Sequence, residues 1–180
     1  MDEIVKAALK KWPTVPHCYD WLALDARGQW FMRDERIRRA GPFPRVKGSL
    51  IRHELLLQFI HRNYESDAQG CWFFQNGPQR VYVELEAAPL VWRVRWGDDD
   101  TLRVQAHTGE DAAAQTAWVD QHGRLFLHAA RGFGIVHSQD MLDAARAIEQ
   151  GVWSPQSLPF EAMPERFGYV LRPEPATPAH

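Results

Sequence analysis

Aromatic, amide and guanidinium side chains are concentrated around a tight turn in the middle of the chain. Two segments with the composition of strands, Trp72–Gln75 and Arg80–Glu86, flank the turn residues Asn76-Gly77-Pro78, which favours a hairpin. Alternate residues of a strand face opposite sides of a sheet, and we expect one face to present these groups together. Such a mixture suits a groove for a small polar ligand or a partner peptide, and it equally suits a buried polar network. The candidate ligand-binding residues of this hairpin are Trp72, Asn76, Arg80 and Tyr82.

A histidine and a glutamate adjoin each other on the helix predicted before this hairpin. Apolar residues at helical spacing predict a helix over 49–63, with Ser49 as its N-cap. His53 and Glu54 lie near its start, and side chains of these types are common acid–base catalysts. A small-molecule enzyme that uses His53, Glu54 and Arg80 without a known motif is therefore one hypothesis. The alternative is that these side chains form a solvated helix face.

The most basic part of the chain covers residues 33–52. It could bind phosphate or another anion, and Trp30 and Phe31 precede it with rings available for stacking. A solvated loop is the alternative, since two acidic residues lie within the stretch and neutralise part of its charge. The formal net charge of the chain is −2, which argues against a dedicated nucleic-acid-binding protein. The candidate anion-binding residues are Arg33, Arg36, Arg38 and Arg39.

Several common catalytic and cofactor-binding patterns are missing from the sequence. His53 and His61 are about 12 Å apart by helical rise, too far to share one metal ion. No Gly-x-Ser-x-Gly motif occurs, and Gly132-Phe-Gly134 lacks the third glycine of a dinucleotide-binding loop. We therefore expect no metal and no cofactor, and we favour a binding protein over an enzyme.

A short pattern, Asp-x-x-Gly followed by large and aromatic residues, occurs three times. It begins at Asp25, Asp67 and Asp120. An aspartate at the first position of a type I turn can bond the backbone two residues on, and a glycine at the fourth position accepts the positive φ that closes a bulged hairpin. We expect the first and third copies to close hairpins over 21–32 and 117–128, and the second to join a helix to a strand.

These patterns predict an α+β protein with an antiparallel curved sheet of hairpins and a meander. Two main amphipathic helices, 49–63 and 138–150, and a short N-terminal helix over 2–11 accompany the sheet. The sheet is expected to be one continuous surface that cradles the helices. The expected organisation is a single domain over 1–154 with related halves at 17–88 and 89–154, then a loosely held proline-rich tail over 155–180.

The composition predicts a cytoplasmic protein. The N-terminal stretch carries two acidic residues and lacks the apolar core of a signal peptide, and no run approaches the length of a membrane span. The two cysteines, Cys18 and Cys71, are too few for a disulfide framework and suit a reducing compartment. We expect no membrane partner and no nucleic-acid partner, and the sequence leaves the oligomeric state open.

Three stretches together resemble an uncharacterised proteobacterial family known only as a domain of unknown function. They are Trp21-Leu-x-Leu-Asp-x-x-Gly-x-Trp-Phe, Ile51-x-His-Glu-x-Leu-x-x-Phe-Ile60 and Cys71-Trp-Phe-Phe-Gln-Asn-Gly-Pro-Gln-Arg-Val-Tyr-Val83. The resemblance covers most of the chain outside the proline-rich tail. Residues 21–86 are more distantly similar to a second family of unknown function, which implies repeated halves and a role in signalling or regulation. Neither resemblance implies a reaction.

The leading hypothesis is a non-catalytic cytoplasmic binding or regulatory module for an unknown small molecule or protein partner. Its groove would lie between the helix 49–63 and the sheet that carries the aromatic and polar hairpin. The alternatives are the motif-free enzyme with a His/Glu/Arg site and the binding of phosphate or nucleic acid through the stretch 33–52.

Overall fold

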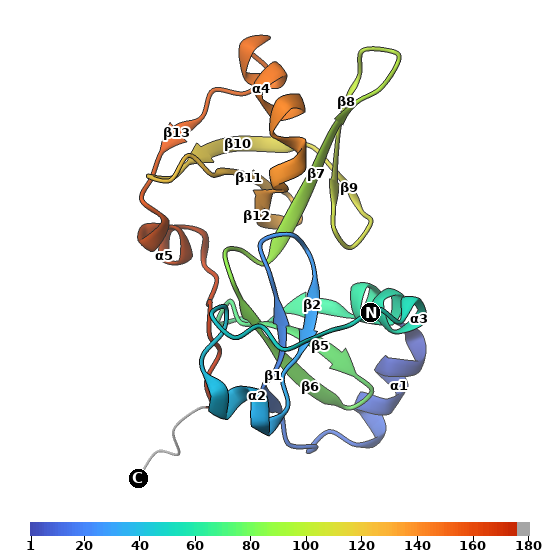
Figure 1. The fold of residues 1–180 in the computed structure, drawn as a ribbon. Helices are drawn as coiled ribbons and strands as arrows, with labels where there is room; N and C mark the ends of the chain where they lie inside the picture. The colour runs from blue at the N-terminus through green and yellow to red at the C-terminus, as the bar shows by residue number, and fades with distance from the viewer. Residues whose placement is uncertain (176–180) are drawn as a thin grey trace. The chain divides into compact units, whose positions relative to one another are not determined.

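The computed structural model describes residues 1–175, which divide into two compact units (Figure 1). Both units contain helix and sheet, which confirms the α+β class. The chain changes unit between Glu86 and Ala87, beside the predicted border between two halves at residues 88 and 89. The first unit comprises residues 1–25, 29–86 and the chain from Tyr169 onward, and the second comprises residues 26–28 and 87–168.

The first unit is built on a six-stranded mixed sheet with the strand order β3-β2-β1-β6-β5-β4. The central pair, β1 and β6, is parallel, and the other neighbouring strands are antiparallel. The strands are β1 (Cys18–Leu24), β2 (Trp30–Met32), β3 (Ser49–Leu50), β4 (Tyr64–Ser66), β5 (Trp72–Asn76) and β6 (Gln79–Leu85).

The second unit is built on a seven-stranded mixed sheet with the strand order β13-β10-β11-β12-β7-β8-β9. Here β12 runs parallel to β7, and β13 runs parallel to β10. The strands are β7 (Leu90–Trp96), β8 (Leu102–Ala106), β9 (Asp111–Ala112), β10 (Ala114–Val119), β11 (Leu125–Ala129), β12 (Gly132–Val136) and β13 (Gln156–Ser157).

The two sheets share one strand order. In each, a hairpin and a short third strand come first, three antiparallel strands follow, and the last of these lies parallel beside the first strand of the hairpin. Strands β1 to β6 thus correspond in order to β7 to β12, to which β13 is added. The expected recurrence is present in the strand order. However, the strands form two mixed sheets and not one continuous antiparallel sheet. The sequence did not predict the parallel pairs, because they join strands that are distant in sequence and leave no local pattern.

The three Asp-x-x-Gly patterns form the same hairpin turn. The glycines Gly28, Gly70 and Gly123 have φ values of 77°, 79° and 74°, which confirms their predicted left-handed conformation. In each turn the aspartate N–H donates to the carbonyl of the residue four positions on, and that residue's N–H donates back to the aspartate Oδ1. The second copy was expected to join a helix to a strand. It closes a hairpin instead, because the short strand β4 separates the helix from the turn.

Two hairpins of the second unit use this turn without an aspartate at its first position. The turns cover residues 97–101 between β7 and β8, and residues 106–110 between β8 and β9. In each, the N–H of the first residue donates to the carbonyl of the fifth, and the N–H of the fourth donates to the carbonyl of the first. Asp100 and Gly109 occupy the left-handed position, with φ values of 59° and 103°. The motif therefore identifies three of five related turns, because the backbone conformation tolerates more than one side chain at its first and fourth positions.

Three helices of nine residues lie within the described chain: α1 (Glu3–Lys11), α3 (Glu54–Arg62) and α4 (Met141–Glu149). The helix predicted over 49–63 begins later, because Ser49 belongs to β3 and His53 is the N-cap. No described helix is long and apolar enough to cross a bilayer. The shorter helices are α2 (Glu35–Ala40), α5 (Met163–Phe167) and the 3-10 turns η1 (Ser138–Asp140) and η2 (Phe160–Ala162).

The segment after residue 155 differs from the loosely held tail that was expected. It contains η2 and α5, and its Met163 and Tyr169 are buried. These side chains hold the segment by apolar burial, which its proline content does not reveal. Residues 176–180 of the expected tail lie outside the described part of the chain.

The sheet of the first unit is covered on both faces. Helix α3 lies on one face, where Phe59 meets Phe74 of β5 edge to face with ring centroids 5.4 Å apart. We call this the helix face. The opposite face, here called the loop face, is covered in part by the segment after α2. Phe43 of that segment packs there with Ala23, Phe31 and Leu50.

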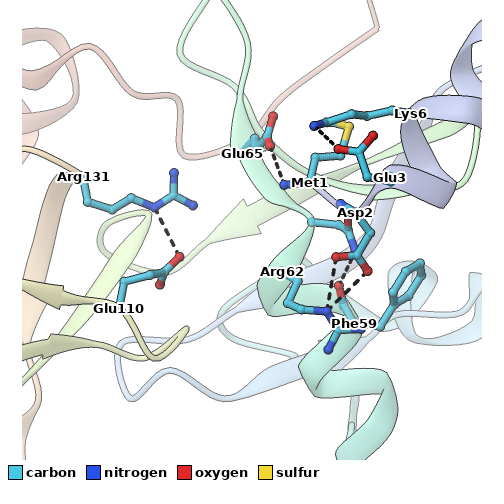
Figure 2. Close-up of polar contacts among 10 residues, drawn as sticks. Met1, Asp2, Glu3, Lys6, Phe59, Arg62, Glu65, Glu110 and Arg131 are labelled. Atoms are coloured by element: carbon cyan, nitrogen blue, oxygen red, sulfur yellow. Dashed lines mark hydrogen bonds and ion pairs between the residues drawn. The ribbon is translucent and has the colours of Figure 1, made fainter.

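Polar contacts tie the N-terminus to the end of α3 (Figure 2). The Asp2 carboxylate lies 3.3 Å from Nε of Arg62, and the Asp2 N–H donates to Oδ1 of Asn63 at 2.8 Å. The amino group of Met1 lies 3.4 Å from Glu65 of β4. Exposed ion pairs contribute at most about 1 kcal/mol each, so the burial of Val5 is the main attachment of α1.

Replacing Gly123 by alanine should lower the free energy of unfolding by about 1 kcal/mol, because a Cβ is disfavoured at a φ of 74°. Among the described residues, apart from the chain neighbours, no heavy atom lies within 4 Å of the added methyl group, so the cost is conformational. Gly123→Asn should cost less, since asparagine tolerates this region. Urea unfolding of the three proteins measures the difference, and an unchanged midpoint for Gly123→Ala would contradict this account.

Asp120 should make the second unit sensitive to acid. Burial alone would raise the pKa of Asp120, but hydrogen bonds from Arg124 and the His122 N–H, with the charge of Arg124, outweigh burial and lower the pKa below its usual 3.8. A lowered pKa in the folded state gives stability that is present above about pH 4 and is lost as the pH falls through the folded pKa. Asp120→Asn should therefore be less stable at neutral pH and lose less stability on acidification. Urea midpoints across this range test both, and parallel pH profiles would refute the assignment.

Candidate functional site

The register of β5 and β6 separates the four candidate residues of this hairpin onto two faces. Phe73 lies opposite Tyr82, and Gln75 lies opposite Arg80. Directly opposed residues share a face, so Tyr82 and Arg80 lie on the loop face, whereas Trp72 and Asn76 lie on the helix face. The expectation of one mixed face is therefore not met. The sequence identifies the hairpin, but the assignment of its two faces depends on the residue-by-residue register.

An apolar pocket lies where the predicted groove was expected, between α3 and the sheet. Its volume is about 240 Å³, and its lining includes Leu56 and Ile60 of α3, Leu22 of β1 and Asn76 at the end of β5. Trp72 is buried and packs against Tyr64, with ring centroids 4.7 Å apart. On this face the structure provides one candidate polar side chain, Asn76, beside an apolar surface.

A larger and more polar pocket lies on the loop face of the first unit. Its volume is about 620 Å³, within the range typical of small-molecule sites. Two of its residues, Arg80 and Tyr82, are among the candidates from the sequence. We call it the tyrosine pocket, and its other lining residues are His17, Tyr19, Asp67, Gln69, Cys71 and Glu174.

Asp67 connects the local turn to the wall of the tyrosine pocket. Its Oδ1 accepts the N–H groups of Gln69 and Cys71, at 3.0 and 2.9 Å, and so closes the turn between β4 and β5. Its Oδ2 accepts the hydroxyl of Tyr82 at 2.9 Å. The sequence identifies Asp67 as a turn residue, but the partner of its second oxygen comes from β6 and has no local signal.

Aromatic rings form a rigid wall of the tyrosine pocket. The rings of Tyr19 and Tyr82 are stacked with centroids 4.7 Å apart and an interplanar angle of 11°. His17 approaches Tyr82 edge-on at 5.7 Å. The guanidinium of Arg80 lies over the ring of Phe73, 4.4 Å from its centroid. It also shares a hydrogen bond with the Tyr82 side chain, and the rest of its edge can bond a ligand.

The phenol and the thiol of the tyrosine pocket are held in their protonated forms. Burial raises the pKa of Tyr82 to about 12, and Asp67 adds to this rise while the neighbouring Arg80 opposes it. Burial and the charge of Asp67 also raise the pKa of Cys71. At neutral pH neither group is a nucleophile or a base, because each acts through its deprotonated form.

The four arginines predicted to bind an anion do not form one site. Arg33 is 2% exposed, and its guanidinium donates to Glu84 at 3.1 Å and to the Gly41 carbonyl at 2.8 Å. It is a buried structural residue of the first unit, and its assignment to an anion site is corrected. Arg38 lies over the ring of Trp21, 5.0 Å from its centroid. The other two, Arg36 and Arg39, are exposed on α2, where Arg39 pairs with Glu35.

His53 and Glu54 are exposed at the start of α3. The Nδ1 atom of His53 accepts the Leu56 N–H at 3.3 Å, so this side chain caps the helix. Both residues lie on the helix that covers one face, whereas Arg80 lies on the other face of the sheet, and the His/Glu/Arg enzyme site is not assembled. No cluster of three potential metal ligands occurs among the described residues.

Removing the charge of Arg33 should destabilise the first unit by about 3–5 kcal/mol, because it leaves the buried carboxylate of Glu84 unpaired. Arg33→Met tests this by urea unfolding. The double variant Arg33→Met with Glu84→Leu should recover part of the loss, since neither charge then remains buried. If Arg33→Met is as stable as the wild type, the pair does not act as a unit. The same follows if the loss in the double variant equals the sum of the losses in Arg33→Met and Glu84→Leu measured singly.

The comparisons with known proteins agree with the resemblance described above. A family model named DUF2944, with the description "Protein of unknown function (DUF2946)", matches residues 1–174. No curated protein matches the chain. A DUF1285 family protein from Silicibacter pomeroyi DSS-3 is 14% identical, with a TM-score of 0.50 over 83% of this chain and 84% of that chain, which supports the fold alone. A DUF1285 family protein from Shewanella baltica OS155 is also 14% identical, with a TM-score of 0.43 over 70% of this chain and 91% of that chain. Because the family match spans nearly the whole sequence, this chain belongs to DUF2944, a family of proteins of unknown function.

Proposed function

We propose that this protein is a non-catalytic binding module whose tyrosine pocket takes a small organic molecule with a ring and a negatively charged group. The observation that carries the proposal is the environment of Arg80. Among the described residues Arg80 forms no ion pair with a carboxylate, and it lies over Phe73 in a pocket of about 620 Å³. A guanidinium in this position is a natural partner for a carboxylate or phosphate oxygen.

The geometry of the pocket supports rigid recognition. Tyr82 is fixed by its hydrogen bond to Asp67 and by its stacking on Tyr19, so little side-chain entropy would be lost when a ligand binds. The two rings offer an aromatic surface for the ring of a ligand, and Arg80 offers the charge that orients it. Glu174 also lines the pocket, and its negative charge would disfavour a ligand with a second anionic group nearby.

Protonation supports binding over catalysis. The raised pKa values of Tyr82 and Cys71 keep both groups neutral at physiological pH. The Tyr82 hydroxyl donates its proton to Asp67 and can accept a hydrogen bond from a ligand, and the neutral thiol of Cys71 can donate one. Acid–base catalysis instead requires groups that titrate close to the working pH.

We place this module in the bacterial cytoplasm. Both cysteines, Cys18 and Cys71, are free thiols, which suits a reducing compartment. The protein would have a regulatory role if ligand binding at the tyrosine pocket altered its association with a partner.

Arg80→Gln should weaken ligand binding without unfolding the protein, since this side chain is only partly buried. Benzoate and phenyl phosphate, which each join a ring to an anion, should raise the melting temperature of the wild type, and benzylamine should not. Arg80→Gln should weaken benzoate binding at least tenfold, about 1.4 kcal/mol, as measured by isothermal titration calorimetry.

Arg36→Gln is the matched control, because it removes the same charge from an exposed position on α2 and should leave benzoate binding unchanged. Equal affinity in Arg80→Gln and wild type would refute the assignment of Arg80. A shift produced by benzylamine alone would instead indicate recognition of a cation through Glu174.

A further inference from the structure

The β7–β8 hairpin of the second unit carries three arginines on one face. In its register Arg93 lies opposite Gln105, and Arg95 lies opposite Arg103. Because directly opposed residues of an antiparallel pair share a face, these four side chains lie together. We call this surface the arginine face. Like charges directly opposite each other destabilise a sheet, so the Arg95–Arg103 pair reduces the stability of the hairpin that carries it.

The described residues neutralise this charge unevenly. Arg93 donates twice to the Asp140 carboxylate, at 2.6 and 2.8 Å, and is therefore fixed. Arg103 lies 3.8 Å from Asp99, but both side chains are well exposed, at 70% and 61%, and such a pair is weak. Arg95 is exposed and forms no ion pair with a described residue.

The arginine face is concave. A depression of about 310 Å³ is lined by Arg93, Arg95, Arg103, Gln105 and Asp111. Gln105 is held by a hydrogen bond from its amide nitrogen to Asp111 at 3.2 Å, so the carboxylate of Asp111 has a partner at one border of the depression. The two guanidinium groups with the least compensated charge, those of Arg95 and Arg103, therefore lie side by side in a hollow of the surface.

The corresponding positions of the first unit show a different use of the same hairpin. Counted from the equivalent turns 25–29 and 97–101, Arg95 and Arg103 correspond to Ala23 and Phe31, which also lie directly opposite each other. Ala23 and Phe31 are buried under Phe43. The same sheet position is thus an apolar core in one unit and an exposed pair of arginines in the other.

We propose that the arginine face binds a phosphate monoester dianion between Arg95 and Arg103. Guanidinium groups match the oxygens of phosphate with paired hydrogen bonds, and a dianion would relieve the repulsion between the two arginines. The bound group would lie beside Arg93, whose own position is set by Asp140. This site is distinct from the tyrosine pocket of the first unit.

The acidic borders favour a compact anion over a nucleic acid. Asp98, Asp99 and Asp100 form the tip of the same hairpin, and Asp111 lines the depression. The phosphates of an extended strand would meet these carboxylates on leaving the arginine face, and repulsion would oppose further contacts. A single phosphate group needs to contact only Arg95 and Arg103.

The test uses glycerol phosphate, inorganic phosphate and a single-stranded oligonucleotide, each titrated into the full chain at matched ionic strength. Glycerol phosphate should bind the wild type and bind the variant Arg95→Gln with Arg103→Gln at least tenfold more weakly. Without ligand, Arg95→Gln alone should unfold at a higher urea concentration than the wild type, because it removes a like-charge contact. Arg80→Gln and Arg36→Gln should bind glycerol phosphate as the wild type does.

Three results would overturn the proposal. Equal binding of glycerol phosphate by the wild type and the double variant would place any phosphate site elsewhere. Loss of binding in Arg80→Gln would assign the ligand to the tyrosine pocket. Tighter, steeply salt-dependent binding of the oligonucleotide would show that the arginine face serves nucleic acid. Binding of inorganic phosphate as tight as that of glycerol phosphate would support recognition of the phosphate group itself.

Discussion

Each aspartate carboxylate of the three Asp-x-x-Gly turns bonds both the backbone of its turn and a side chain, and much of the structure depends on this double role. One oxygen accepts backbone N–H groups and closes the turn. The other oxygen accepts a side chain: Lys47 for Asp25, Tyr82 for Asp67 and Arg124 for Asp120, at 2.9, 2.9 and 2.7 Å. The first two come from distant segments, whereas Arg124 belongs to the turn itself. Closing a hairpin therefore also fixes a second side chain. In two turns that partner is a cation, whereas at Asp67 it is a phenol.

The two sheets use one strand order for different surfaces. A β-sheet needs at least one covered face for stability, and the other face is free to vary. In the first unit, the opposed pair of residues next to the turn of the β1–β2 hairpin is apolar: it is Ala23 and Phe31, covered by Phe43. In the second unit the same position is the pair Arg95 and Arg103. A shared scaffold thus supports an apolar core in one case and a charged hollow in the other.

The candidate site illustrates how far local patterns extend. The hairpin of β5 and β6, the turn at Asp67 and two residues of the pocket, Arg80 and Tyr82, could be predicted from composition and spacing. The contributions of Tyr19 and His17 could not, because they come from β1 and the residue before it, which reach β6 through a parallel pairing between distant segments. Arg33 shows the opposite error. It reads as part of a basic surface, but a buried carboxylate on β6 makes it structural.

The sequence by itself determined the class of fold, the three aspartate turns with their left-handed glycines and the approximate helices, because each of these depends on residues within a few positions of one another. Only the tertiary structure decided that the strands form two mixed sheets, that Trp72 and Tyr82 lie on opposite faces, and which arginines are buried. These features depend on strand register and on pairing between distant segments. A shift of register by one residue exchanges the two faces of a strand. The face on which a side chain lies is therefore settled by packing of the whole chain.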